Sequence, residues 1–196
     1  MPLVPGLMVS SDGHAEAAAI AESLGYPVLL KAASGGGGKG MLIGYSEEEL
    51  KVAIGVARAE AGRAFGDSSI YIEKLVHPAR RIEVQLLADG FGNIMHLGER
   101  DYSIQRRFQK IIEESPSPAV DDALRDRLTR AVIKVARVVG YCNAGTVEFL
   151  VDGNNFYSME VNPRLQVEHT VTELVTGIDI VKEQILIAAG EPLRFH

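Results

Sequence analysis

The 196-residue chain has only one cysteine, Cys142, so it cannot form an internal disulfide, and a reducing compartment is expected. It also lacks any apolar run close to the roughly 20 residues that a membrane span needs. The N-terminus does not show the charged and then apolar pattern of a signal peptide. These absences favour a cytoplasmic protein with no membrane partner, or one of the mitochondrial matrix or plastid if the source is eukaryotic.

The chain also lacks a long block of like charges: its net charge is −6, and acidic and basic residues are interspersed. A nucleic-acid partner bound through a basic face is therefore not expected. Hydrophobic residues make up 46% and charged residues 23% of the chain, which is an ordinary globular composition. No internal repeat or low-complexity linker is present. The length suits one sizeable core or two small subdomains that share a site.

Hydrophobic periodicity and turn signals predict an α+β chain. Helices are expected at 14–24, 46–64, 120–140 and 171–190, and the last is broken at Gly177. Strands are expected at 26–32, 41–45 and 68–76, with two hairpins at 81–101 and 144–162. The predicted boundary lies near His77-Pro78, giving domains 1–76 and 77–196. Both ends look cut, "MPLVPG" in mid-loop and "AAGEPLRFH" just after a helix, as in an excised domain.

Glycine is concentrated in "KAASGGGGKGM", Lys31–Met41. Residues 35–40 match G-x-G-x-x-G, but a dinucleotide fold needs a helix after the loop, and "MLIGY" is strand-like. The phosphate loop G-x-x-x-x-G-K-[ST] also does not match, because Ala33 stands where its first glycine belongs and a glycine follows Lys39. What remains is a glycine-rich hairpin such as kinases place over phosphates, or else a mobile surface loop. The first interpretation is favoured, with Lys31 as a point charge for a phosphate.

The stretch "TVEFLVDGNNFYSMEVNPR" predicts a cation site. A three-residue loop at Gly153–Asn155 would place Glu148 opposite Glu160, and Asn162 would share the face of Glu160 because strand side chains alternate. Two carboxylates and an amide oxygen suit Mg²⁺ or Mn²⁺. A solvated polar face of the hairpin is the alternative. The metal interpretation is favoured because a phosphate loop is predicted in the same chain.

Four ordered motifs then resemble the biotin carboxylase family of ATP-grasp enzymes: "GYPVLLKAASGGGGKGM", "ERDYSIQRRFQKIIEESP", "GTVEFL" and "MEVNPRLQVEHTVTE". The resemblance covers practically the whole chain. It implies the central ATP-grasp portion, with a small glycine-loop lid subdomain and a larger antiparallel sheet-and-helix subdomain. Such enzymes, found in acetyl-CoA, propionyl-CoA, methylcrotonyl-CoA, pyruvate and urea carboxylases, use MgATP and bicarbonate to carboxylate biotin on a carrier protein. A carboxyltransferase component is the further partner.

Residue roles carried over by position are implied by this resemblance alone. The implied ATP-binding residues are Lys31, Gly35, Gly36, Gly37, Gly38, Glu73, Lys74, Val76, Arg81, Gln105 and Leu150. The implied ligands of two Mg²⁺ or Mn²⁺ ions are Glu148 and Glu160, with Asn162 beside them. The implied bicarbonate pocket consists of Lys110, Arg164, Gln166, Val167 and Glu83, the last orienting Lys110. The implied catalytic residues are Lys110, Arg164 and the general base Glu168.

The pattern "NPRLQVEH" adds an expectation about the base. Arg164, Gln166 and Glu168 alternate, so an extended segment would point all three toward one pocket. A carboxylate beside Arg164 should be held ionised, since a neighbouring cation favours the charged form. An ionised carboxylate can accept a proton, as a base must.

Three positions depart from the family, which usually has histidine at Arg81, often histidine at Phe108, and proline at Thr170. An upstream phosphate-binding lysine and a downstream arginine lie outside the chain, so the fragment alone is expected to bind nucleotide weakly and to turn over poorly. One alternative is a ligase of the carbamoyl-phosphate synthetase type, which shares "EVNPR" but not "QVEH". The other is a non-catalytic nucleotide-binding module.

Overall fold

The computed structural model describes residues 1–9, 13–34, 41–107 and 109–195. They form two compact units, which are described separately: the small unit is Val4–His77, and the large unit is Met1–Leu3 with Pro78–His196. The predicted lid glycines, Gly35–Gly38, and the departure at Phe108 lie outside the described residues, so both predictions stay open. None of the helices in the described part of the chain is long and apolar enough to cross a membrane.

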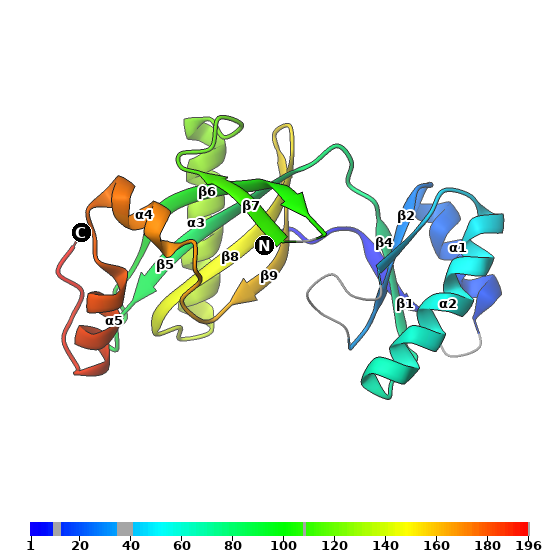
Figure 1. Ribbon diagram of the computed structural model, residues 1–196, viewed down its shortest axis with the longest axis horizontal. Coiled ribbons are helices and arrows are strands. Elements are labelled where there is room, and N and C mark those ends of the chain that lie inside the picture. Colours follow the sequence, from blue (N-terminus) through cyan, green and yellow to red (C-terminus); the bar gives the residue numbers. More distant parts are fainter. Residues whose placement is uncertain (10–12, 35–40, 108, 196) are drawn as a thin grey trace. The chain divides into compact units, whose positions relative to one another are not determined.

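The small unit is a four-stranded antiparallel sheet with two helices on one face (Figure 1). The strand order is β1-β4-β2-β3, with bounds Gly6–Val9 (β1), Val28–Ala32 (β2), Met41–Gly44 (β3) and Ile70–Lys74 (β4). Helices α1 (His14–Leu24) and α2 (Glu47–Phe65) bury Ile20 and Ile54 against Leu30 and Ile72 of the central strands. The unit therefore has a core of its own.

The expected bounds of the two helices of the small unit are confirmed to within one residue. Helix α1 ends at Gly25, whose φ of 73° favours glycine. Helix α2 begins after Ser46, whose hydroxyl accepts a hydrogen bond from the backbone N–H of Glu49 at 3.3 Å. The Glu49 carboxylate in turn accepts from the N–H of Tyr45 at 3.1 Å, one residue before the donor of a standard capping box.

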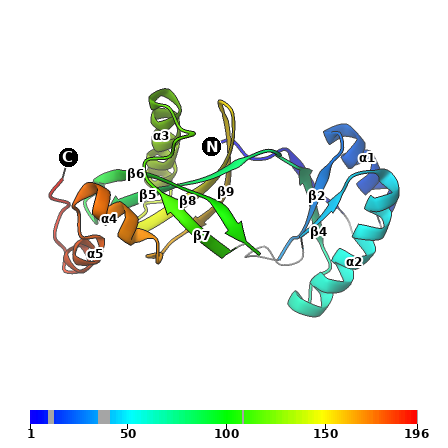
Figure 2. The same cartoon turned by 45° about the horizontal axis from the view of Figure 1, so that its top comes forward.

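The large unit is built on a five-stranded antiparallel sheet of order β7-β6-β5-β8-β9 (Figures 1 and 2). The strands are Arg80–Ala88 (β5), Ile94–Arg106 (β6), Gln109–Glu114 (β7), Asn143–Asp152 (β8) and Asn155–Asn162 (β9). The helices are Asp122–Val138 (α3), His169–Thr176 (α4) and Ile180–Ala188 (α5). Both predicted hairpins and the break at Gly177 are confirmed, whereas β7 is absent from the predicted elements.

The two faces of this sheet differ in chemistry. Alternate residues of β5 and β8, among them Ile82, Val84, Val147 and Phe149, pack on the buried side of α3. Their strand neighbours point to the opposite face, where Leu87 packs against α5 and the C-terminal segment. The residues beside Leu87 on that face are polar and buried: Glu83, Gln85, Thr146 and Glu148. A polar surface is thus enclosed between the sheet and the segment leading to α4.

A β-bulge brings β6 into line with this polar face. Val84 pairs with Glu99 and Leu86 with His96, so Gln85 alone faces both Leu97 and Gly98. Gly98 has φ of 82°, a backbone conformation that glycine adopts at little cost. Because the extra residue shifts the side-chain alternation by one, the following even-numbered residues of β6, Arg100 and Tyr102, share the face of Glu83.

Candidate active site

The predicted metal ligands Glu148 and Glu160 do face each other across β8 and β9. The reason given for this pairing is wrong, however. The hairpin loop has two residues, because Asp152 already pairs with Asn155. A bulge at Met159 then shifts the register and restores the Glu148–Glu160 pairing.

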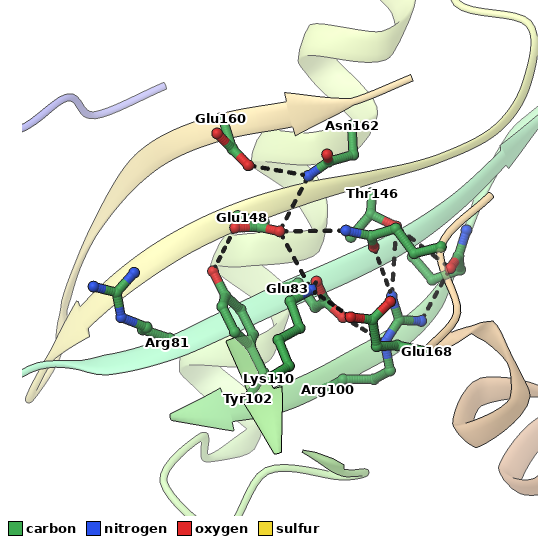
Figure 3. A network of polar contacts seen from close by, with 12 residues as sticks. Arg81, Glu83, Arg100, Tyr102, Lys110, Thr146, Glu148, Glu160, Asn162 and Glu168 are labelled. Carbon is green, nitrogen blue, oxygen red and sulfur yellow. Dashed lines mark hydrogen bonds and ion pairs between the residues drawn. The ribbon is translucent and has the colours of Figure 1, made fainter. Parts of the chain in front are cut away.

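The two carboxylates are joined by an amide. The Asn162 side-chain nitrogen donates to Glu148 Oε1 at 3.1 Å and to Glu160 Oε1 at 3.4 Å (Figure 3). The Asn162 oxygen, predicted to bind metal, instead accepts from Arg164 at 3.3 Å. Among the described residues, no group of three or more His, Cys, Asp and Glu could hold a metal ion. Two facing carboxylates nevertheless fit Mg²⁺, which proteins often bind through one or two carboxylates together with substrate phosphates.

Lys110 of β7 lies at the centre of three carboxylates. Its Nζ is 2.5 Å from Glu83 Oε2, 3.3 Å from Glu148 Oε1 and 3.3 Å from Glu168 Oε1 (Figure 3). Burial alone would lower the pKa of Lys110, but the charges of these carboxylates outweigh it and raise the pKa. The ammonium group therefore stays charged, and the contact with Glu83 that the resemblance implied is present.

Arg100, which is absent from the predicted site, connects this face to α4. Its side chain is completely buried, and its Nε donates to Glu83 Oε1 at 2.7 Å. The remaining partners of the guanidinium are Gln85 at 2.9 Å, Thr172 at 2.7 Å, Thr146 at 3.4 Å and Gln166 at 3.3 Å. A guanidinium has five N–H donors in a fixed fork, so this set uses its donors in every direction. Arg100 thus fixes Glu83 and Gln166 at once.

The segment that carries Glu168 is not extended, which corrects the prediction. The backbone turns at Gln166, whose carbonyl accepts from the N–H of His169 at 3.2 Å, and Glu168 has helical angles at the start of α4. Its cationic partner is Lys110, whereas the exposed Arg164 donates to Asn162 and to the Leu165 carbonyl. The adjacent Val167 is 86% exposed.

The expected ionised state of Glu168 is nevertheless supported. Burial alone would raise the pKa of Glu168, but a hydrogen bond from its own backbone N–H, the charge of Lys110 and hydrogen bonds with Lys110 and Glu113 together lower it. The cation responsible is therefore Lys110 in place of the predicted Arg164. Glu168 is an ionised carboxylate beside an ammonium group, an arrangement that can accept a proton.

Glu113 of β7 is a further acidic residue that the sequence did not indicate. Burial and then the charges of Glu168 and Glu83 raise the pKa of Glu113 to about 7, against the opposing effect of Lys110. Its Oε2 is buried and meets no hydrogen-bond donor in the described part of the chain. Because a hydrogen bond between two carboxyl groups needs one proton, Glu113, whose pKa is raised, holds that proton below about pH 7, and Glu168 is the ionised member of the pair.

This pair predicts a pH dependence of stability. Since the pKa of about 7 in the folded state exceeds the ordinary value of 4.5, the folded state binds more protons between these values, and stability falls as pH rises through that window. Glu113→Gln cannot lose a proton, so its stability relative to the wild type should be greater at about pH 8 than at about pH 5. Thermal unfolding across this range checks the result. The exposed neighbour Glu114 supplies the control, Glu114→Gln, and parallel profiles for wild type and Glu113→Gln would contradict the expectation.

The other predicted nucleotide residues of the large unit lie along the same strands. Arg81 pairs with Leu150 across β5 and β8, and its guanidinium lies 3.9 Å from the sulfur of Met159, the bulged residue. Gln105 pairs with Lys110 across β6 and β7. The structure thus brings these side chains onto strands that also carry the acidic and basic residues, although it does not test their binding of nucleotide.

The predicted nucleotide residues of the small unit form a second group. Lys31 on β2 makes an ion pair with Glu73 on β4 at 2.5 Å, and the glutamate side chain is buried. The Lys74 ammonium donates to the carbonyls of Gly25 and Tyr26 at 2.7 and 3.2 Å, so it also holds the turn before β2. Val76, which follows β4, is half-buried. The roles of these residues stay predictions.

Comparison with known proteins identifies the family. Residues 1–196 match the model for "Carbamoyl-phosphate synthase L chain, ATP binding domain". The chain belongs to this family. It is 51% identical to Biotin carboxylase 1 of Bacillus subtilis over 195 residues, covering 98% of the chain and 43% of that relative. This ATP-grasp domain is therefore of the biotin carboxylase type, and it spans less than half of the relative's length.

Solved structures agree with this assignment. The biotin carboxylase–βγ-ATP complex of Campylobacter jejuni is 49% identical with a TM-score of 0.93, covering 100% of this chain and 44% of that one. The biotin carboxylase domain of Hydrogenobacter thermophilus 2-oxoglutarate carboxylase, solved with MgADP, ADP and bicarbonate, is also 49% identical, with a TM-score of 0.92 and coverage of 100% and 43%. The predicted ATP-grasp fold of α+β class is confirmed.

Proposed function

We propose that the full-length protein containing this domain uses MgATP and bicarbonate to carboxylate biotin on a carrier protein, as part of a biotin-dependent carboxylase with a carboxyltransferase component. The observation that carries the proposal is the position of Lys110 among Glu83, Glu148 and Glu168. One ammonium group there contacts a proposed metal ligand, a proposed base and a buried orienting carboxylate. With Arg164 and bound metal ions offsetting the carboxylates, Lys110 would supply a fixed cation for a small anion next to a nucleotide phosphate.

In the proposed reaction, Lys110 and Arg164 hold bicarbonate, with Gln166 and Val167 completing the pocket. A bicarbonate oxygen attacks the γ-phosphorus of ATP, the bond from that phosphorus to the β,γ-bridging oxygen breaks, and ADP leaves carboxyphosphate behind. Bound Mg²⁺ or Mn²⁺, of which two ions are proposed at Glu148, Glu160 and Asn162, would neutralise charge on the phosphates. Carboxyphosphate then releases CO₂ to N1′ of biotin, whose proton leaves through Glu168 and the released phosphate.

The state of the acidic residues supports these roles. Glu168 is ionised and can take a proton, while Glu113 beside it, whose pKa is raised to about 7, supplies a hydrogen-bond donor when it is protonated. Glu83 is held by both Arg100 and Lys110, so it cannot swing away from the lysine. Nucleotide contacts are proposed for Arg81, Gln105 and Leu150 in the large unit and, in the small unit, for Lys31, Glu73, Lys74, Val76 and Gly35–Gly38.

Bicarbonate-dependent ATP hydrolysis by the full-length protein tests the proposal. Release of ADP should require bicarbonate and a divalent cation, and free biotin should increase it, because biotin accepts the carboxyl group. Manganese should replace magnesium, since the proposed ligands are all oxygen atoms. A rate of ATP hydrolysis that does not depend on bicarbonate would contradict the proposal and favour another ATP-grasp ligase. ATP binding without any turnover would favour a non-catalytic module.

A further inference from the structure

Tyr102 of β6 contacts both a proposed metal ligand, Glu148, and the proposed bicarbonate-binding residue Lys110. Its side chain is 1% exposed, and its hydroxyl donates to Glu148 Oε2 at 2.7 Å (Figure 3). The phenol is the donor of this hydrogen bond, because a carboxylate oxygen can only accept. A buried tyrosine needs such a partner for its hydroxyl, and here the partner is a proposed metal ligand.

The contacts of Glu148 divide between its two oxygens. Oε1 accepts hydrogen bonds from the side-chain amides of Asn162 at 3.1 Å and Gln166 at 3.3 Å, and it forms an ion pair with Lys110 at 3.3 Å. Oε2 accepts a hydrogen bond from the Tyr102 hydroxyl at a shorter distance, 2.7 Å. A carboxylate offers about four lone-pair positions, so one hydrogen bond to Oε2 fixes the plane of the group without using all of its capacity. Tyr102 therefore sets the orientation in which Glu148 presents its oxygens.

The same ring contacts the proposed bicarbonate lysine. Lys110 Nζ lies 4.3 Å from the centroid of the Tyr102 ring, within the range of a cation–π interaction. The ammonium group thus has the ring on one side and the carboxylates of Glu83, Glu148 and Glu168 on others. The ring and the hydroxyl of one residue act on two different groups, and this allows the two effects to be separated by substitution.

We infer that Tyr102 is a positioning residue that orients Glu148 for the metal ion through its hydroxyl and Lys110 for bicarbonate through its ring. The inference rests on the proposed function. A hydrogen-bond partner that orients a metal ligand typically contributes 10- to 100-fold to metal affinity. Because Lys110, Asn162 and Gln166 also hold Glu148, the lower end of that range is expected.

Tyr102→Phe removes the hydroxyl and keeps the ring. In the full-length protein, calorimetric titration should show that MgATP binds about tenfold more weakly, whereas ATP in the presence of a chelator binds with nearly unchanged affinity. The bicarbonate concentration that gives half-maximal ATP hydrolysis should change less than twofold, since the ring remains over Lys110. Glu160→Gln, which alters a proposed ligand directly, serves as the positive control for the metal-dependent step.

Tyr141→Phe is the matched negative control. Tyr141 is a half-buried tyrosine of the same unit, and its hydroxyl donates to the carbonyl of Ala144 at 2.9 Å, away from the acidic cluster. This variant should bind both forms of ATP as the wild type does. Tyr102→Leu removes the ring as well, so it should show the metal defect of Tyr102→Phe and, in addition, need about three- to tenfold more bicarbonate.

Two results would overturn the inference while the proposed function stands. In the first, the wild type is active, and Tyr102→Phe binds MgATP as tightly as the wild type does. In the second, Tyr102→Phe loses thermal stability, and its affinities for MgATP and for metal-free ATP fall by the same factor. That result would identify the hydroxyl as purely structural. A wild type with metal-dependent ATP binding but no bicarbonate-dependent hydrolysis would instead refute the proposed function, and the role of the Tyr102 ring with it.

Discussion

Replacing Glu168 with glutamine in the full-length protein is expected to slow biotin carboxylation by about 10²- to 10⁴-fold, the usual contribution of a positioned base. Glutamine has the size of glutamate but cannot take up the proton. The structure holds Glu168 ionised beside Lys110, and glutamine at this position would still accept a hydrogen bond from the ammonium group. ATP affinity should therefore change little, because the substitution removes a chemical step and leaves the fold in place.

The competing explanation is a structural glutamate that braces the start of α4. Although Glu168 occupies the N-cap position of α4, its side chain makes no capping hydrogen bond there. Thermal stability of Glu168→Gln should consequently stay close to that of the wild type. Glu173→Gln is a suitable control, because Glu173 lies on the same helix and its carboxylate accepts from the backbone N–H of Ile180 at 2.7 Å. Near wild-type carboxylation by Glu168→Gln would exclude it as the base.

The elements of the fold follow from short-range signals that are visible in the sequence. Helix α1 ends at Leu24 as expected, and α2 begins at Glu47, one residue after the expected start, with Ser46 as its local cap. The Glu148 side chain points away from Val147 and Phe149 because the strand alternates and the apolar neighbours are buried under α3. Such rules act over a few residues, and so one chain without its structure is enough to apply them.

The bulges are the part of the site that these rules miss. A strict alternation places Lys110 and Glu113 on opposite faces of β7, yet both contact Glu168. Gln105 pairs with Lys110 and Ile104 with Ile112, so Ile111 is an extra residue that reverses the alternation. Nothing local marks Ile111 for this role, because the bulge depends on how β6 and β7 fit together.

The bulges at Gly98 and Met159 have the same effect on the other strands. The glycine is a partial signal, since an isolated glycine in a strand pattern suggests a bulge. Met159 gives none, and its bulge made a pairing correct that had been predicted from a wrong loop length. The role of Arg100 could likewise not be predicted from the sequence. Its partners come from β5, β8 and the segment around α4, and only the folded sheet brings them together.

Removing the Arg100 guanidinium is expected to cause the largest loss of stability. Arg100→Met should lower the free energy of unfolding by about 3 to 5 kcal/mol, the usual cost of breaking a buried ion pair by removing one partner. Glu83 would keep a buried charge with only Lys110 beside it, and Gln166 and Thr172 would lose a hydrogen-bond donor. Urea denaturation followed by circular dichroism measures the difference.

The exposed Arg130 provides a matched control for Arg100. Its Nε donates to Asp126 Oδ1 at 2.8 Å across one turn of α3. Because exposed ion pairs contribute little, Arg130→Met should cost no more than about 0.5 kcal/mol. A loss for Arg100→Met as small as that of the control would show that the buried guanidinium does not hold the sheet and α4 together.

A second substitution tests the physical cause. If the cost of Arg100→Met comes mainly from the uncompensated charge of Glu83, then adding Glu83→Gln should recover part of it, because a neutral amide needs no cation. The double variant should therefore be more stable than Arg100→Met alone, with a coupling energy of about 1 to 3 kcal/mol in the double-mutant cycle. Additive losses would instead assign the cost to the lost hydrogen bonds with Gln85, Thr146, Gln166 and Thr172. In that case Arg100 would stabilise the site as a scaffold of donors, and its charge would be secondary.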